Sequence, residues 1–248
     1  MEFSGKKVTV VGTGISGIGA VGLLNAVGAE VVLYDGNEKL KIEDIEKKLG
    51  TYKAEIVLGE LTKELTDSSD LLVISPGVPI DSPVVKAFEA AGVPIWGEVE
   101  LAYAFDKGKV LAITGTNGKT TTTALVGQIV GAYHKDTFVV GNIGNPYTTE
   151  VLKSNKDSYT VAEISSFQLE TVHEFHPLVS AILNITPDHL NRHYTMDCYV
   201  QTKEKIAMNQ KGSEVCVLNF DDDYLREFGE HTTAKKLDSI EKSRQRVE

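Results

Sequence analysis

The sequence predicts an α/β protein built on parallel sheets, and three observations support this class. Short β-branched apolar runs alternate with helical stretches along the chain, as they do in βαβ units. Two of these runs, residues 7–11 and 110–114, lead directly into glycine-rich loops. The chain has 248 residues, which is enough for two domains of ordinary size.

The first hundred residues read as strands and helices in alternation. A strand at 7–11 precedes a helical stretch at 16–28, and a second strand follows at 30–35. Further along, a strand at 70–74 precedes a helical stretch at 82–92. This order predicts a parallel sheet in the first part of the chain.

A second domain is expected beyond a short connector formed by Asp106, Lys107 and Gly108. We therefore expect one domain at 1–106 and another at 107–248. Three later apolar runs, within 158–166, 179–189 and 213–223, each end in polar residues. Ligands bind at the carboxyl ends of strands in open α/β sheets, so these polar ends predict a ligand site. The polar tail from 235 onward gives no firm prediction.

Composition excludes several classes of function. The formal net charge is −10 and no run of Lys and Arg forms a basic stripe, which argues against a nucleic-acid partner. Cys198 and Cys216 lie eighteen residues apart without a C-x-x-C motif, so neither a disulfide framework nor a zinc site is indicated. The first residues, an acid and two lysines before a very short apolar run, lead us to expect neither a signal peptide nor a transit peptide, and no stretch approaches membrane-spanning length. We expect a cytoplasmic protein without a membrane partner.

The first glycine loop is a complete G-x-G-x-x-G formed by Gly12, Gly14 and Gly17. This spacing gives a tight turn and close backbone approach to a pyrophosphate at a helix N-terminus, as in a Rossmann-like domain. Asp35 stands eighteen residues beyond Gly17, where a ribose-binding acid is expected. The alternative is that the glycines only shape a turn and Asp35 caps a strand. A diphosphate beside a ribose describes NAD and a UDP-sugar equally well.

The second glycine loop reads G-x-x-G-K-T, which is shorter than the usual P-loop of a mononucleotide-binding domain. Its backbone N–H groups could cradle phosphates, Lys119 could neutralise the β and γ groups, and the hydroxyl of Thr120 or Thr121 could reach Mg²⁺. The alternative is a glycine turn with a solvated lysine and a threonine N-cap. The expected nucleotide contacts are Gly115, Thr116, Asn117, Gly118, Lys119, Thr120 and Thr121.

Three motifs that follow the first loop in order, GTNGKTTTT, AEISSFQLE and NITPDHLNRH, resemble those of the Mur ligases of peptidoglycan synthesis. The stretch SSFQLE is similar to that of members that add D-glutamate to UDP-N-acetylmuramoyl-L-alanine. The resemblance runs from residue 8 to about residue 222. It implies a monomeric, ATP-dependent and ADP-forming ligase with two Mg²⁺ sites. In such enzymes the γ-phosphate of ATP activates a carboxylate as an acyl phosphate, which the amine of the amino acid then attacks.

The resemblance also implies roles for residues of the first domain, which would bind the UDP part of the substrate. Family members often carry a basic residue two positions after the acid at the end of the second strand, and this sequence has Asn37 there. At this position the sequence departs from the family pattern, so the resemblance does not fix the uracil contacts. The implied substrate contacts of this domain are Gly14, Ile15, Ser16, Gly17, Asp35 and Ser75.

In the second domain the resemblance implies that Glu163 and His189 bind Mg²⁺ beside Thr120, and that Asn142 contacts substrate. Lys203 matches a lysine that CO₂ carbamylates to supply a further metal ligand, and Lys205 is the neighbouring alternative. The implied catalytic set is Lys119, Glu163, His189 and Lys203, and the implied metal ligands are Thr120, Glu163, His189 and Lys203.

Two helix starts are expected near this second site. Ser165 and Gln168 form an S-x-x-Q capping box, and Gln168 could also reach the muramoyl group. Thr186 is expected as an N-cap with Pro187 as the first helical residue, which would set Asp188 and His189 in the first turn.

The family has a third, C-terminal domain that binds the amino acid and contributes to the ATP site. We therefore expect that this chain lacks that domain, that its central domain is incomplete, and that the chain alone is inactive. Three alternatives stay open: a nicotinamide oxidoreductase, a sister Mur ligase for a different amino acid, and a substrate-binding fragment without chemistry. A folylpolyglutamate synthetase is disfavoured, because it shares the central domain but not the first one.

Overall fold

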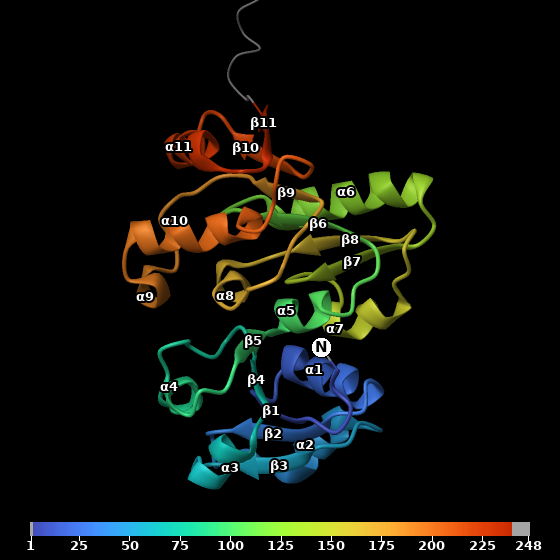
Figure 1. The fold of residues 1–248 in the computed structure, drawn as a ribbon, viewed down its shortest axis with the longest axis vertical. Helices are drawn as coiled ribbons and strands as arrows, with labels where there is room; N and C mark the ends of the chain where they lie inside the picture. Colours follow the sequence, from blue (N-terminus) through green and yellow to red (C-terminus); the bar gives the residue numbers. More distant parts are fainter. Residues whose placement is uncertain (1, 240–248) are drawn as a thin grey trace, which may run out of the picture. The chain divides into compact units, whose positions relative to one another are not determined.

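A computed structural model describes residues 2–239, and the strands and helices of this range divide into two units (Figure 1). All strand pairs within the described range are parallel, which confirms the predicted α/β class. The first unit comprises the residues up to Phe105 together with Pro146–Leu152 and Thr171–His173. The second comprises Asp106–Asn145, Lys153–Glu170 and the residues from Glu174 onward.

The first unit contains a five-stranded sheet with the order β3-β2-β1-β4-β5. Its strands are β1 (Lys7–Val11), β2 (Glu30–Asp35), β3 (Glu55–Leu58), β4 (Leu71–Ile74) and β5 (Ile95–Gly97). Its helices are α1 (Ile15–Ala26), α2 (Ile42–Leu49), α3 (Lys63–Ser68), α4 (Pro83–Ala90), α5 (Glu98–Tyr103) and α7 (Tyr147–Glu150), which the short 3₁₀ helix η1 (Val151–Lys153) follows. The strands and helices predicted in this part of the sequence are confirmed.

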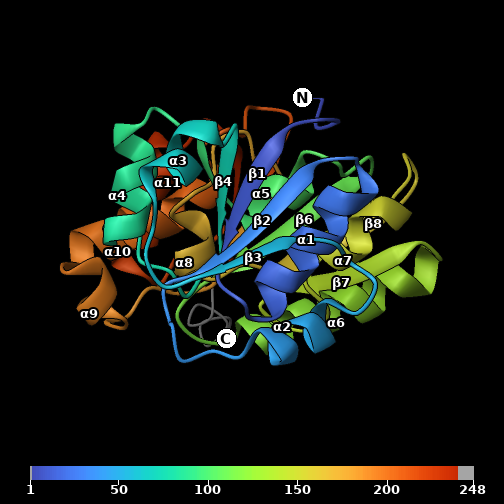
Figure 2. The same ribbon diagram turned by 90° about the horizontal axis from the view of Figure 1, so that it is seen from below.

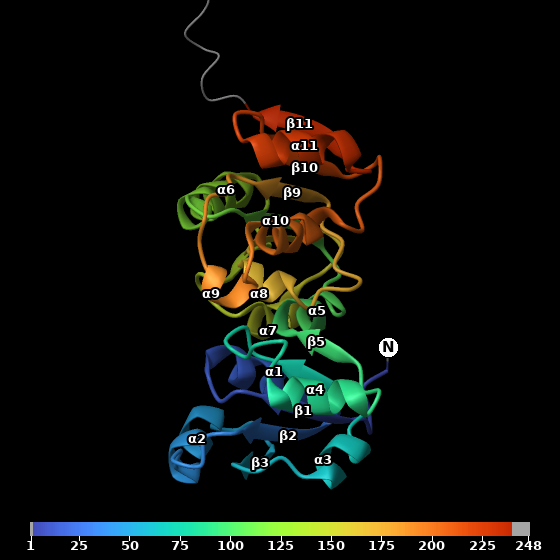
Figure 3. The ribbon, with the colours of Figure 1, turned by 90° about the vertical axis from the view of Figure 1, so that its left-hand side faces the viewer.

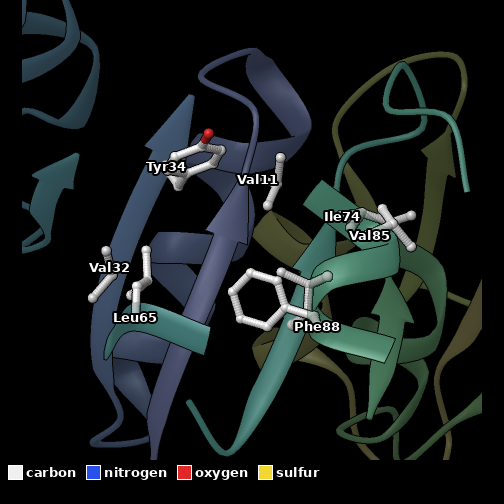
Figure 4. Close-up of a cluster of buried hydrophobic side chains, with 8 residues drawn as sticks. Val11, Val32, Tyr34, Leu65, Ile74, Val85 and Phe88 are labelled. Atoms are coloured by element: carbon white, nitrogen blue, oxygen red, sulfur yellow. The ribbon is translucent and has the colours of Figure 1, made fainter. Parts of the chain in front are cut away.

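Both faces of the first sheet are covered, which explains why its strands are apolar throughout. On one face, Val11 of β1 and its register neighbour Tyr34 of β2 pack with Leu65 of α3 and Phe88 of α4 (Figure 4). Phe88 is fully buried, and burial of a side chain of this size stabilises the fold by about 1.5–3 kcal/mol. Helix α1 contacts β1 and β2. Figure 2 shows α1 beside α2.

Two segments from the second half of the sequence return to the first unit, which the sequence analysis does not anticipate. The carboxylate of Glu98, only 2% exposed, accepts hydrogen bonds from the N–H and the hydroxyl of Thr148 at 2.9 and 3.2 Å. The equally buried Glu100 accepts a hydrogen bond from the N–H of His173 at 2.8 Å. A buried carboxylate is tolerated only where such donors satisfy it. Helix α5 therefore holds both returning segments.

The second unit contains a six-stranded sheet with the order β11-β10-β9-β6-β8-β7. Its strands are β6 (Lys109–Thr114), β7 (Thr137–Gly141), β8 (Tyr159–Glu163), β9 (Val179–Ile182), β10 (Val215–Asn219) and β11 (Lys235–Ser239). Its helices are α6 (Lys119–Tyr133), α8 (Ser166–Leu169), α9 (Leu190–His193), α10 (Met196–Glu204), the 3₁₀ helix η2 (Lys205–Ala207) and α11 (Asp223–His231). Within residues 2–239, no helix of either unit is long and apolar enough to span a bilayer.

Helices α6 and α11 cover opposite faces of the second sheet (Figure 3). Gly127 of α6 lies so close to Val139 of β7 that a Cβ atom on the glycine would overlap the valine. A Cβ atom on Gly229 of α11 would overlap Lys236 of β11 and would lie 3.3 Å from Leu218 of β10. The strand register puts Val139 and Leu218 on opposite faces, because partners across the sheet share a face and successive residues alternate.

The first glycine loop needs glycine at two positions for different reasons. Gly12 has a φ of 103°, in the left-handed region that favours glycine. A Cβ atom on Gly17 would overlap the carbonyl oxygen of Gly12. Gly14, by contrast, has a φ of −80°, and a Cβ atom there would meet nothing within 4 Å.

Gly17→Ala should therefore lower the free energy of unfolding of the first unit by about 1–3 kcal/mol, because the loop and α1 must move apart. Gly14→Ala is the matched control and should change it by less than about 1 kcal/mol. Urea unfolding followed by the fluorescence of Trp96, the single tryptophan, measures both in this unit. Equal losses in the two variants would contradict the packing described for Gly17.

Candidate functional site

The first candidate site lies at the carboxyl ends of β1, β2 and β4. The order of the sheet makes the point between β1 and β4 a topological switch, where α/β proteins bind ligands. Gly12 and Ser75 face each other there, since a Cβ atom on Gly12 would lie 2.7 Å from Ser75 Oγ. That hydroxyl is buried and has no hydrogen-bond partner within the described part of the chain. It is a free donor beside the loop.

The N-terminus of α1 is the second feature of this site. Gly14 is the N-cap, no side chain caps the helix, and its first turn contains no acidic residue. Uncapped N–H groups and the positive end of the helix dipole favour an anion at this position. The predicted contacts Ile15 and Ser16 lie in this first turn, with Ile15 79% exposed.

Asp35 is bonded into the glycine loop. Its Oδ2 accepts hydrogen bonds from the N–H and the hydroxyl of Thr13 at 3.3 and 3.0 Å, and its Oδ1 accepts one from the N–H of Asn37 at 3.1 Å. The carboxylate therefore orients Thr13 between the first two glycines of the motif. Its predicted contact with ribose or uracil stays a prediction.

The second candidate site begins with the loop between β6 and α6. Gly115 has a φ of 146° and Gly118 a φ of 82°, so both adopt left-handed conformations. Gly118 is the N-cap of α6, whose first turn contains no acidic residue and starts at Lys119. The N–H of Asn117 donates to Asn184 Oδ1 at 2.8 Å, and Asn184 Nδ2 donates to the carbonyl of Asn117 at 3.0 Å. The side chain of Asn184, which the sequence analysis missed, thus fixes the loop.

Two lysines converge on the carbonyl oxygen of Gly115. Lys119 Nζ donates to this oxygen and to the carbonyl of Thr116, each at 2.9 Å. Lys203 Nζ donates to the Gly115 oxygen at 2.9 Å from α10. The structure therefore brings Lys203 to the loop, although the polar sequence around it alone indicates a solvated helix residue.

The environment of Lys203 favours its neutral amine. The side chain is only 2% exposed, and its Nζ lies 4.7 Å from the ring centre of Tyr199. Burial lowers the pKa of Lys203 to about 7, with a further lowering by the charge of Lys119 and an opposing effect of Asp188. Lys205 lies elsewhere and donates to the carbonyl of Glu170 at 3.1 Å.

Glu163 at the end of β8 joins three elements of this site. Its Oε2 accepts a hydrogen bond from the Thr120 hydroxyl at 2.9 Å, and its Oε1 accepts one from Asn142 Nδ2 at 2.8 Å. Glu163 is 1% exposed, and the hydrogen bond identifies Thr120 as the threonine that contacts this carboxylate. Carboxylate and hydroxyl oxygens are the ligands that Mg²⁺ prefers, so this pair fits that ion. No group of three or more His, Cys, Asp or Glu side chains within residues 2–239 could hold a metal.

The helix start predicted at Thr186 and Pro187 is wrong. Helix α9 begins at Leu190, and His189 is its N-cap with a φ of 52°. The Thr116 hydroxyl accepts a hydrogen bond from the N–H of Thr186 at 3.0 Å and donates to its carbonyl at 3.1 Å. Because these bonds tie Thr186 to the second glycine loop, the chain turns into the helix three residues later. The capping box of Ser165 and Gln168 on α8 is confirmed.

His193 is a buried residue of this region that the sequence analysis missed. Its ring stacks on Phe167 at 5.5 Å between centres, and Phe167 lies 4.9 Å from His189. On its other side the His193 ring lies 5.2 Å from Tyr199, and its Nε2 is 2.9 Å from Ser166 Oγ. Burial lowers the pKa of His193 to about 4, and the charge of neighbouring Arg192 adds to the shift. The only signal in the sequence is the spacing of two histidines by four residues.

Comparison with known proteins gives two family matches. The Mur ligase middle domain matches residues 113–247, more than half of the chain, and the Mur ligase MurD-like N-terminal domain matches residues 6–97. The UDP-N-acetylmuramoylalanine–D-glutamate ligase of Lachnospira eligens is 69% identical over 92% of this chain and 51% of its own length. The protein of the same name from Lachnoclostridium phytofermentans is 58% identical over 91% of this chain and 50% of its own. The chain spans about half the length of these relatives.

Solved structures share the fold at low identity. The UDP-N-acetylmuramate:L-alanyl-γ-D-glutamyl-meso-diaminopimelate ligase from Neisseria meningitides aligns with a TM-score of 0.61 at 16% identity, over 95% of this chain and 78% of that one. A murein peptide ligase from Psychrobacter arcticus aligns with a TM-score of 0.55 at 14% identity, over 94% of this chain and 53% of that one. Both support the two-unit α/β architecture.

His193 should make the stability of the second unit depend on pH. Its folded pKa of about 4 lies below its ordinary value of 6.5, so the unfolded chain binds the proton more tightly. The stabilisation is therefore complete above pH 6.5 and is lost as pH falls toward 4, by about 2–3 kcal/mol in total. The free energy of urea unfolding is measured between about pH 6.5 and 4 in the presence of a chelator, for wild type and for His193→Gln. The difference between the two proteins gives the contribution of His193. Parallel curves of unfolding free energy against pH would contradict this contribution.

Proposed function

The chain belongs to the Mur ligase family, and on that premise we propose that the protein adds D-glutamate to UDP-N-acetylmuramoyl-L-alanine with conversion of ATP to ADP. The ATP chemistry is proposed from one observation. Lys119 and Thr120 begin α6, and the Thr120 hydroxyl donates a hydrogen bond to the buried Glu163. The amino acid and the UDP-substrate are inferred from the printed names of relatives up to 69% identical to this chain.

In this proposal the first unit binds the UDP part of the substrate. The N–H groups of Gly14, Ile15, Ser16 and Gly17 face the diphosphate, which completes the uncapped start of α1. The free Ser75 hydroxyl supplies one further donor at the switch point. Asp35 contributes by holding Thr13 and hence the shape of the loop.

The second unit binds ATP through its glycine loop. Lys119 contacts two loop carbonyls and can exchange them for the β- and γ-phosphate oxygens, because a charged acceptor makes a stronger hydrogen bond than a neutral one. Helix α6 starts at Lys119 without a side-chain cap, so in this proposal its first N–H groups also face the phosphates. Asn142 donates a hydrogen bond to Glu163. In this proposal Asn142 also contacts the UDP-substrate, and Gln168 contacts the muramoyl group of the same substrate.

Thr120 and Glu163 would hold one Mg²⁺, and His189 and a carbamylated Lys203 would hold a second. When bound, these ions offset the negative charge that a triphosphate, a diphosphate and two carboxylates bring into an acidic protein. The substrate carboxylate attacks the γ-phosphorus, ADP leaves, and the D-glutamate amine then displaces phosphate from the acyl phosphate. Lys119 neutralises part of the charge throughout. In the full-length enzyme, holding the reactants in line can supply about 7–11 kcal/mol of the barrier.

Lys119→Ala should weaken Mg-ATP binding roughly 10- to 100-fold, because a charged hydrogen-bond donor to the phosphates is lost. Binding of the UDP-substrate should not change, because its proposed contacts in the first unit are intact. Lys156→Ala, at an exposed lysine of the second unit, is the matched control. Calorimetry with both ligands measures the three proteins. Equal ATP affinity in Lys119→Ala and the control would refute the nucleotide assignment.

Lys203 should form a carbamate in which its neutral amine attacks CO₂, an N–C bond forms and one proton is released. The burial of this amine beside the glycine loop supports the reaction, since the neutral form is the nucleophile. Carbon-13 bicarbonate should give a carbamate resonance in wild type and in Lys205→Ala, and none in Lys203→Ala. A resonance that disappears only in Lys205→Ala would assign the carbamate to the neighbouring lysine.

A further inference from the structure

Lys48 on α2 contacts the first glycine loop, and no role in the sequence analysis uses it. Ile45 and Leu49 are buried on the inner side of α2, so the helix is fixed against the first unit. From this helix Lys48 Nζ donates to the carbonyl oxygen of Thr13 at 3.3 Å. Thr13 lies between the first two glycines of the G-x-G-x-x-G motif.

The charge of Lys48 is not neutralised by a carboxylate. The preceding Lys47 pairs with Asp44 at 3.5 Å, and Lys6 pairs with Asp70 at 2.9 Å. Within the described residues, no Asp or Glu oxygen lies within ion-pair distance of Lys48. Residues 1–105 contain no arginine, and Lys48 is the one basic side chain of the described first unit with a hydrogen bond to this loop.

An anionic ligand at this loop needs a full positive charge nearby. The N-terminus of α1 supplies the equivalent of only about half an elementary charge. Asp35, bonded to Thr13, places a carboxylate at the same loop, and the whole chain carries a net charge of −10. A nucleoside diphosphate would meet repulsion from both unless a cation offset it.

The contact of Lys48 with Thr13 is easily redirected. Its length of 3.3 Å exceeds the range of about 2.7–3.2 Å that is usual for an N–H···O hydrogen bond, so the carbonyl holds the ammonium weakly. An ammonium group has three donors on a flexible stem, and it can keep one neighbour while it takes a phosphate oxygen.

We propose that Lys48 is an anion-binding residue of the first glycine loop and that its ammonium group contacts the diphosphate of a uridine diphosphate ligand. The proposal rests on the assignment of this loop to the UDP-substrate. It adds to that assignment the residue that supplies the counter-charge.

The test is calorimetry of the 248-residue chain with UDP and with uridine. Lys48→Met should weaken UDP binding roughly tenfold and leave uridine binding unchanged, because only the phosphates carry charge. The fall of UDP affinity with added salt should also become less steep. Lys47→Met, at the adjacent lysine paired with Asp44, is the matched control and should bind both ligands as wild type does. Lys48→Arg should retain most of the UDP affinity.

The outcomes separate the proposal from its premise. If wild type binds UDP and Lys48→Met binds it as well as Lys47→Met does, the role of Lys48 is refuted while the substrate assignment stands. An equal loss of affinity for UDP and for uridine in Lys48→Met would mean that Lys48 contacts the nucleoside and not the phosphates. That result would also refute the proposal. If wild type binds neither ligand, the assignment of the first loop fails and the proposal fails with it. Thermal unfolding of each variant checks that the exposed substitution leaves the fold intact.

Discussion

The carbonyl oxygen of Gly115 is the acceptor on which the second site depends, because Lys119 and Lys203 both donate to it. Its direction is set by a φ of 146°, which glycine tolerates and a residue with a Cβ atom rarely adopts. Leu183 and Asn184 lie 3.1–3.3 Å from the place of that Cβ, so the loop is also closed against the segment after β9. One backbone conformation thus brings two amines together, and the charge of Lys119 adds to the lowering of the pKa of Lys203 by burial.

A buried carboxylate, that of Glu163, contacts the start of α6. Glu163 is almost completely buried, and its two carboxylate oxygens accept hydrogen bonds from the side chains of Thr120 and Asn142. The three groups come from the ends of three neighbouring elements, β8, α6 and the loop after β7. Parallel strands bring their carboxyl ends to one edge, so the fold itself makes this meeting possible. The run of four threonines, a poor helix interior by propensity, is explained in part by the bond of Thr120.

Local sequence predicts much of this architecture, and contacts distant in sequence account for what it misses. The strand and helix order, both glycine loops and the Ser165 capping box follow from patterns within a few residues. The burial of Lys203 does not, because it depends on the packing of α10 against a loop 88 residues away. The true start of α9 depends in the same way on Thr116, 70 residues before Thr186. Strand β11 arises from a polar tail whose five residues are all exposed, and only pairing with β10 makes it a strand.

The two glycine loops differ in the groups that would stabilise a bound phosphate. In the second loop, Lys119 lies directly on two loop carbonyls, so a full charge is present where the proposed triphosphate would bind. The first loop contains no basic residue of its own, and its donors are the N–H groups of α1, the Ser75 hydroxyl and, in our proposal, the Lys48 ammonium group from α2. A ligand with lower charge density suits such a loop, since partial charges, hydrogen bonds and a single lysine offset its charge. The difference in local charge between the loops therefore agrees with a diphosphate on the first and a triphosphate on the second. It also explains why the G-x-G-x-x-G motif alone, which fixes backbone shape, cannot distinguish a UDP-sugar from a dinucleotide.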